Sequence, residues 1–272
     1  MTDRYAAFDR LKFDWPAPGV LRLTLSNPGK ANAITPRMHH QLEQVWAAID
    51  ADPETRVTII TGEGRAFCGG GALDDMPDET GALDRGQQFS LDFGNATRLV
   101  KNIIDARKPI VSAINGAAVG AGLALALLAD ISIASRTAKL LDGHVRIGVT
   151  AGDHAAIVWP LLCGMAKAKY YLLTNRTMTG EEAERNNLVS LAVDAEALET
   201  TSIEVASELA AAAPTAVRMT KHVLNHWLRQ NAAIFELSSA LEIVNFFGAE
   251  ATEAMAAMVE KRPANFTTDV LF

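Results

Sequence analysis

The sequence predicts an α/β fold, because two consecutive segments each run from an apolar strand through a glycine turn towards a helix. The first strand is Val57–Thr61, followed by the glycine-rich stretch Gly62–Gly71. The second strand is Ile110–Ile114, and another apolar strand, Asp130–Ser135, comes after its helix. Strands that alternate with helices in this way are typical of a layered α/β protein.

The N-terminal part is predicted to form a hairpin and a helix. The hairpin strands are Phe8–Asp14 and Val20–Ser26, and leucines alternate with polar residues in the second strand, so one face is buried. Thr35 is placed to cap the next helix, Pro36 occupies its first position, and apolar spacing continues to about Ile49.

Helices and short strands are expected in the rest of the chain, and Pro77–Gly86 is expected to be a loop. Thr179 and Glu182 have the spacing of a capping box. The domain prediction is an α/β core over residues 1–194 and a C-terminal helical region over 195–272. The other expected elements are helices at Gln87–Asp105, Asp153–Leu162, Met165–Leu173, Ala195–Ala212, Pro214–Gln230 and Ala232–Glu260, and a strand at Val189–Val193.

Composition excludes several classes of function. The 272 residues carry a formal net charge of −7 without a basic block, which argues against a nucleic-acid partner. The charged N-terminus does not resemble a signal peptide, and no apolar run is long enough to cross a bilayer. The two cysteines, Cys68 and Cys163, occur in unrelated contexts, as in proteins of a reducing compartment. We therefore expect a cytoplasmic protein with no membrane partner.

The stretch Ile110–Asp130 is the best candidate for chemistry. Glycines between a strand and a helix allow a ligand to approach the backbone closely. The start of the helix offers unpaired N–H groups and the positive end of the helix dipole, which suit an oxygen that becomes negative during a reaction. The alternative is a core helix that follows a tight turn.

Five segments of the chain resemble the crotonase superfamily, the enoyl-CoA hydratases and isomerases. The resemblance implies a spiral of β-β-α turns with C-terminal helices that form a homotrimer or a dimer of trimers. It also implies an acyl-CoA substrate, coenzyme A as part of that substrate, no permanently bound cofactor, and an oxyanion hole made of two amides. The segments are Asn27–Asn32, Gly62–Met76, Ile110–Asp130, Ile147–Gly152 and Glu260–Phe266.

The resemblance assigns roles by position. The two amides of the oxyanion hole are those of Gly71 and Ala121. The alternative for Gly69–Gly71 is a flexible turn, and the alternative for Lys30 and Lys261 is that both are solvated surface charges. The residues expected to bind the coenzyme A part are Lys30, Ala31, Gly69, Gly70 and Lys261.

The chain departs from the family at its acid/base residues. Family hydratases hold and activate water with two glutamates, and these positions are Ala124 and His144 here. The aspartate that follows the first glycine turn in the family is Ala72 here. The usual addition of water therefore cannot be inherited by analogy.

His144 and Asp153 are the predicted replacements. A histidine can act as general acid or base near neutral pH, and an aspartate that accepts its second ring N–H fixes the tautomer and stabilises the imidazolium. Asp153 is the aspartate predicted for this role. The alternatives are a surface histidine at 144 and an N-cap at 153 for the following helix.

The spacing of His144 and Asp153 is similar to that in the 6-oxocamphor hydrolases, the branch of the superfamily that hydrolyses β-diketones. Those enzymes carry another histidine in the central glycine turn, where this chain has Ala121. Glu242 lies near a further acidic position of that branch, and the alternative for Glu242 is a solvated helix charge.

Three functions remain open at this point. The first is a CoA-dependent, hydratase-like enzyme with an altered acid/base set. The second is a hydrolase that cleaves a C–C bond of a β-diketone or cyclic 2-keto acyl-CoA, and the third is a non-catalytic acyl-CoA binder. No metal site is expected, since His222 and His226 lack the glutamate of a zinc protease motif, and Cys68 is expected only to pack.

Overall fold

The computed structural model describes residues 2–72 and 85–267. A six-stranded sheet has the order β1-β2-β3-β5-β7-β10. The hairpin β1–β2 is antiparallel and every other pairing in this sheet is parallel. Its strands are β1 (Leu11–Ala17), β2 (Val20–Leu25), β3 (Val57–Gly62), β5 (Ile110–Ile114), β7 (Ile131–Ser135) and β10 (Leu191–Val193).

A smaller sheet has the order β4-β6-β8-β9. Its first three strands pair in parallel, whereas β9 pairs antiparallel with β8. The carboxyl ends of β4, β6 and β8 therefore lie along one edge. The strands are β4 (Ala66–Cys68), β6 (Ala117–Val119), β8 (Lys139–Leu141) and β9 (Met178–Thr179).

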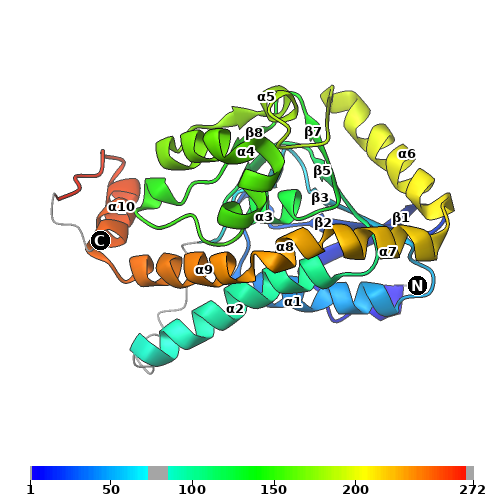
Figure 1. Ribbon diagram of the computed structural model, residues 1–272, viewed down its shortest axis with the longest axis horizontal. Coiled ribbons are helices and arrows are strands. Elements are labelled where there is room, and N and C mark those ends of the chain that lie inside the picture. Colours follow the sequence, from blue (N-terminus) through cyan, green and yellow to red (C-terminus); the bar gives the residue numbers. More distant parts are fainter. Residues whose placement is uncertain (1, 73–84, 268–272) are drawn as a thin grey trace.

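Helices surround the two sheets (Figure 1). α1 packs on α2, α2 packs on α9, and α6 packs on β3 and β5 of the large sheet. The helices are α1 (Pro36–Ala51), α2 (Arg85–Asp105), α3 (Ala121–Leu127), α4 (Ala155–Thr174), α5 (Gly180–Arg185), α6 (Leu198–Ala211), α7 (Pro214–Leu224), α8 (His226–Gln230), α9 (Ala232–Phe246) and α10 (Ala249–Glu260), with short 3₁₀ turns η1 (Thr2–Tyr5), η4 (Val145–Ile147) and η5 (Ala195–Ala197).

Both faces of the large sheet are buried. Ile60 belongs to the main core with the leucines of β2, while its neighbour Ile59 belongs to a second core on the other face. Residues of α6, including Leu198 and Ala206, complete that second core. This explains why Val57–Thr61 reads as a continuous apolar run, as expected for a strand covered on both sides. The C-terminal helices therefore share a core with the sheet.

Most predicted elements are confirmed. The hairpin forms, the Thr35 side chain accepts a hydrogen bond from the Met38 N–H, and the capping box of Thr179 and Glu182 is complete. Several predictions are wrong. The single helices expected at Pro214–Gln230 and Ala232–Glu260 are each two helices, α7 with α8 and α9 with α10. The segments 66–68 and 117–119, read as parts of turns, are short strands, and the helix expected at Asp153 begins at Ala155.

The start of α4 differs from the prediction because the carboxylate of Asp153 is used elsewhere. His154 is the N-cap residue, and no side chain caps the helix there. The helix also continues through Gly164, whose φ of 74° marks a kink between the two helices predicted separately. The loop predicted over Pro77–Gly86 lies mostly outside the described residues.

No single helix in the described ranges is long and apolar enough to cross a membrane; α9 and α10 pass such a test only as a pair bent by 63°.

We expect the substitution Gly116→Ala to destabilise the fold strongly. A Cβ at this position would lie 1.9 Å from the Arg65 carbonyl oxygen, so β4 and β6 would have to separate. Thermal unfolding should report a loss of about 3 kcal/mol or more, since forced overpacking of this kind is costly. Gly71→Ala is the matched control, because no atom of residues 2–72 or 85–267 lies within 4 Å of its added Cβ. Equal melting temperatures for the two variants would contradict the expectation.

Candidate active site

Two glycine turns meet at the shared edge of the small sheet. β4 leads into Gly69–Gly71, β6 leads into Gly120, and the strands are in register at Cys68 and Ala118. Gly70 has a φ of 97°, a backbone conformation that suits glycine. A Cβ on Gly122 would lie 2.5 Å from the Cys68 Cβ, so the start of α3 rests directly on β4. Only glycine permits this approach.

Each turn presents one amide predicted for the oxyanion hole. The Ile34 N–H donates to the Gly70 carbonyl at 2.8 Å, and the Ala72 N–H donates to the Ile34 carbonyl at 2.9 Å. These two hydrogen bonds on either side of Gly71 do not use the Gly71 N–H. Ala121 is the first residue of α3, where an N–H has no acceptor within the helix. Neither amide donates a hydrogen bond to another described residue.

A third turn follows β8 and brings His144 to the same edge. The Gly120 N–H donates to the Leu141 carbonyl at 3.1 Å, and a Cβ on Gly143 would contact Val119 at 3.4 Å. The turn after β8 therefore packs against the central glycine turn. His144 is 7% exposed, so the predicted acid/base residue is a buried group and not a surface histidine.

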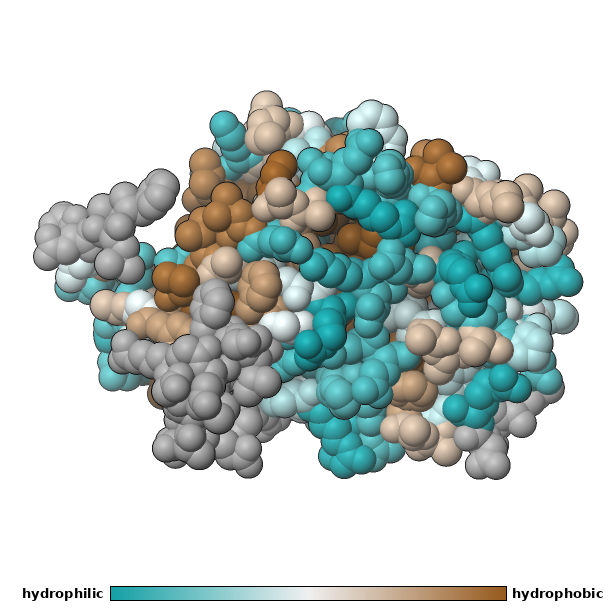
Figure 2. Space-filling view, turned by 60° about the horizontal axis from the view of Figure 1, so that its bottom comes forward, coloured by the Kyte–Doolittle hydropathy of each residue, from teal (hydrophilic) through white to brown (hydrophobic). Residues whose placement is uncertain are grey.

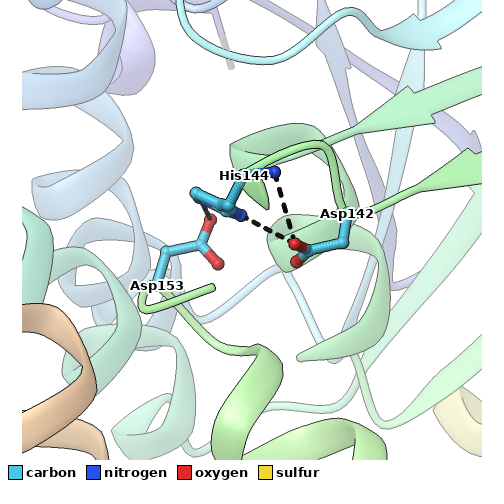
Figure 3. A group of neighbouring side chains, drawn as sticks. All are labelled: Asp142, His144 and Asp153. Carbon is cyan, nitrogen blue, oxygen red and sulfur yellow. Dashed lines mark hydrogen bonds and ion pairs between the residues drawn. The ribbon is translucent and has the colours of Figure 1, made fainter. Parts of the chain in front are cut away.

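Carboxylates lie on both sides of the His144 ring (Figure 3). Asp142 Oδ2 lies 3.0 Å from Nδ1. Glu242 Oε1 lies 3.3 Å from Nε2, and Asp153 Oδ2 lies 3.8 Å from the same nitrogen. The structure thus corrects one assignment: the carboxylate that bonds Nδ1 and fixes the tautomer is Asp142, and Asp153 faces the opposite nitrogen.

Glu242 reaches this group because α9 packs closely on Gly152. A Cβ on Gly152 would lie 2.5 Å from Glu242 Oε2, and the Ser238 hydroxyl donates to the Gly152 carbonyl at 2.9 Å. Glu242 is 9% exposed, so it is not the solvated helix charge that the sequence left as an alternative. Ser238 and Glu242 are one turn apart, and their common approach to Gly152 depends on tertiary packing.

The groups of this cluster shift one another's pKa values. Burial opposes protonation of His144, but Asp153, Asp142 and Glu242 outweigh it and hold the pKa of the imidazole well above its ordinary value. Burial raises the pKa of Glu242 above its usual range, although His144 acts in the opposite direction. The cluster therefore favours the protonated imidazole of His144, while burial makes Glu242 easier to protonate than an ordinary glutamate.

The residues expected to bind coenzyme A are brought together in part. The Gly69 N–H donates to the Ala31 carbonyl at 2.8 Å, so the loop that carries exposed Lys30 rests on the first glycine turn. Buried Asn32 holds this loop by donating to the Glu63 and Ala66 carbonyls at 2.9 Å. Lys261 is exposed at the end of α10, which packs on η4 and α9, and the described contacts do not join Lys261 to that loop.

The remaining candidates carry no chemistry of their own. Burial raises the pKa of the Cys68 thiol to about 11, as expected of a packing residue. His222 lies in α7 and His226 in α8. Ligand-type atoms of Asp142, His144 and Asp153 lie within 4.8 Å of one another, a spacing suited to a cation. Both ring nitrogens of His144 already face carboxylates, Asp142 at Nδ1 and Glu242 at Nε2.

An apolar cavity of about 670 Å³ lies beside the cluster, between η4, α4, α9 and α10. Val145 and Ala151, next to His144 and Gly152 in the chain, lie in its wall. Figure 2 shows apolar side chains gathered toward the end of the molecule where α10 lies, while hydrophilic and apolar side chains are mixed over the opposite end. Its lining residues do not include His144, Gly71 or Ala121, so this cavity is adjacent to the cluster without opening onto it. Other lining residues are Val149, Pro160, Leu172 and Phe266.

The fold and the paired glycine turns define a crotonase-type protein, and comparison with known proteins places it in one family. Residues 17–269 match the model of the enoyl-CoA hydratase/isomerase family. The chain belongs to this family.

Several relatives match over most of their length. A probable enoyl-CoA hydratase of Mycobacterium bovis is 32% identical over 90% of this chain and 93% of its own. The 1,2-epoxyphenylacetyl-CoA isomerase of Escherichia coli is 31% identical over 92% and 95%. The crystal structure of an enoyl-CoA hydratase/isomerase from Pseudoalteromonas atlantica superposes with a TM-score of 0.84 at 26% identity, over 95% and 100% of the two chains.

The stability of the protein should depend on pH through His144. Because its pKa is raised in the folded state, the stabilisation is complete below about pH 6.5, the ordinary value, and is lost as the pH rises through the folded-state value. The melting temperature of wild type should therefore exceed that of His144→Gln most at pH 6, and the difference should shrink towards pH 9.5. The exposed control His222→Gln should show no such trend, and a difference that grows with pH for His144→Gln would contradict the assignment.

Proposed function

We propose that the protein is an acyl-CoA enzyme of the hydratase-like lyase type, in which His144 and its carboxylates replace the usual pair of glutamates. The observation that carries this proposal is the common edge of the small sheet. The amides of Gly71 and Ala121 and the imidazole of His144 all follow strands that end there. Relatives named as enoyl-CoA hydratases and CoA isomerases support the substrate class.

The two amides act on the thioester oxygen. As an enolate forms, negative charge develops on this oxygen, and a fixed N–H donor stabilises it more than it stabilises the starting carbonyl. Loss of one such donor typically costs about 3–4 kcal/mol of transition-state stabilisation. Gly69, Gly70 and Ala31 hold the backbone beside the Gly71 amide, and Lys30 and Lys261 are proposed to meet the phosphates of coenzyme A.

His144 holds the proton that the reaction needs. Water forms a C–O bond at the β-carbon, the C=C electrons move onto the thioester oxygen, and the α-carbon of the enolate takes a proton from the imidazolium. The proton released by the water returns to the group of imidazole and carboxylates, so the site is restored. Asp142 keeps Nδ1 bonded throughout, which leaves Nε2 as the nitrogen for transfer.

The proposed assembly is a homotrimer or a dimer of trimers, and it is supported by large apolar side chains on the helical surface. Met165, Leu173, Trp227 and Leu237 are each more than half exposed. Apolar area of this extent is typical of interaction surfaces. Coenzyme A enters as part of the substrate, and no permanent cofactor is proposed.

A second candidate function is hydrolysis of a C–C bond in a β-diketone or a cyclic 2-keto acyl-CoA. The observation in its favour is that Glu242 joins His144 and Asp153 in one buried cluster. In that reaction His144 takes a proton from water, the water attacks the ketone, and the departing enolate occupies the two amides. The raised pKa of His144 favours an acid over a base, and Ala121 replaces the further histidine of the diketone hydrolases.

The first test is binding followed by turnover. We expect acetoacetyl-CoA to bind with micromolar affinity by calorimetry, and camphor-type diketones not to bind. With a series of trans-2-enoyl-CoA substrates, His144→Ala should lower turnover by about 10²-fold or more, the scale of a general acid or base. The control His222→Ala should keep full turnover. Binding of a diketone without CoA would support the hydrolase, and thioester binding without turnover of any substrate would support a non-catalytic binder.

The oxyanion hole is tested by removing one N–H. Gly71→Pro deletes this donor, and we expect turnover to fall by about 10²–10³-fold. Gly71→Ala keeps the N–H, and its added Cβ meets none of the described residues within 4 Å, so it should retain most of the activity. Kinetics on both variants, with melting curves to confirm folding, provide the measurement. A folded Gly71→Pro variant with normal turnover would place the hole elsewhere.

A further inference from the structure

A second buried histidine, His154, lies on the other side of Asp153 from His144. His154 is fully buried, and its Nδ1 lies 2.5 Å from Asp153 Oδ1. The other carboxylate oxygen, Oδ2, faces His144 Nε2 at 3.8 Å. The two oxygens of Asp153 therefore face two different imidazoles, and a rotation of this carboxylate would break both arrangements.

Trp159 fixes the protonation state of His154. Its indole Nε1 lies 3.4 Å from His154 Nε2, and both side chains are fully buried. An indole N–H can only donate, so Nε2 must be the acceptor and carries no proton. The proton of a neutral His154 is then on Nδ1, where it donates to Asp153. The direction of hydrogen bonding thus runs from Trp159 through His154 to Asp153.

The backbone is consistent with this role. His154 occupies the N-cap position of α4, yet no side chain caps the helix, since the His154 ring is bonded to Asp153 and Trp159 instead. Its carbonyl accepts from the Ile157 and Val158 N–H groups at 3.1 and 2.9 Å, so the first turn holds the residue in place. Trp159 lies five residues on and points back to the start of the same helix.

We propose that His154, locked in one tautomer by Trp159, is a positioning residue that keeps Asp153 ionised and turned towards His144. The idea rests on the proposed function only in so far as His144 takes part in proton transfer. Burial by itself opposes ionisation of Asp153, but the hydrogen bonds that His154 donates and the positive charge of His144 hold the pKa of this carboxyl below its usual range. Removing His154 therefore makes Asp153 easier to protonate, and so weakens the negative charge beside His144.

The test is a pH titration of His144, measured by NMR on protein with isotope-labelled histidine rings. The groups that face this ring are Asp142, Asp153 and Glu242, and His154 faces it through Asp153. In His154→Leu the Nδ1–H donor is lost, so the midpoint of His144 should move to lower pH by about 1 unit or more. His154→Asn retains an N–H donor near the Nδ1 position and should restore most of the wild-type midpoint.

Trp159→Phe provides an independent variant should His154→Leu fail to fold. Without the indole N–H, His154 can carry its proton on Nε2 instead, so Nδ1 no longer donates to Asp153 and the His144 midpoint should also move to lower pH. In kinetics, His154→Leu should lower kcat by about 10-fold or more with little change in KM, as expected of misplaced rather than missing groups. An unchanged His144 midpoint in Trp159→Phe or in folded His154→Leu would overturn the proposal.

The titration needs no substrate, which separates this inference from the proposed function. If His144→Ala leaves turnover intact while His154→Leu still moves the His144 midpoint, the proposed function is wrong and the positioning role stands. If His144→Ala removes turnover and the midpoint is the same in every His154 and Trp159 variant, the positioning role is wrong and the proposed function stands.

Discussion

Parallel pairing of β4, β6 and β8 is the constraint on which the rest of the site depends. Strands that run in parallel end at one edge, so the turns that follow them must meet there. Three segments far apart in sequence, around Gly71, Ala121 and His144, become neighbours for this reason. The strands are only three residues long, and glycines such as Gly116 and Gly122 let the backbones approach closely enough for the pairing to hold.

The second determinant is the balance of charge in a buried volume. One imidazole faces three carboxylates, and three separate buried anions would be far too costly unless protons or positive charge compensated them. The pKa values of His144 and Glu242 are both raised, which favours proton uptake on these groups and reduces the cost. The same compensation supplies the transferable protons that the proposed reaction uses, so what makes the cluster tolerable in the interior also suits it to acid/base chemistry.

Local patterns predicted the larger elements well, because caps, glycine turns and apolar strands are encoded by neighbouring residues. The cap at Thr35 and the buried strand at Val57–Thr61 are examples. The short strands β4 and β6 were missed, since three residues carry no periodicity and exist only through pairing. Asp142 was passed over for Asp153 because sequence spacing does not show which nitrogen a carboxylate will meet. The burial of Glu242 depends on α9 meeting Gly152, a contact 90 residues apart in the chain.

Residues other than the usual glutamates do not alter the two amides of the proposed oxyanion hole, because those amides belong to the backbone. Ala124 lies inside α3 and is 3% exposed, so this helix contributes packing and the amide at its start but no acid or base. The proposed proton-transfer groups come instead from the turn after β8, the start of α4 and one face of α9. Because these elements are separate from the turns that carry Gly71 and Ala121, the proposed acid/base group can differ without any movement of the two amides.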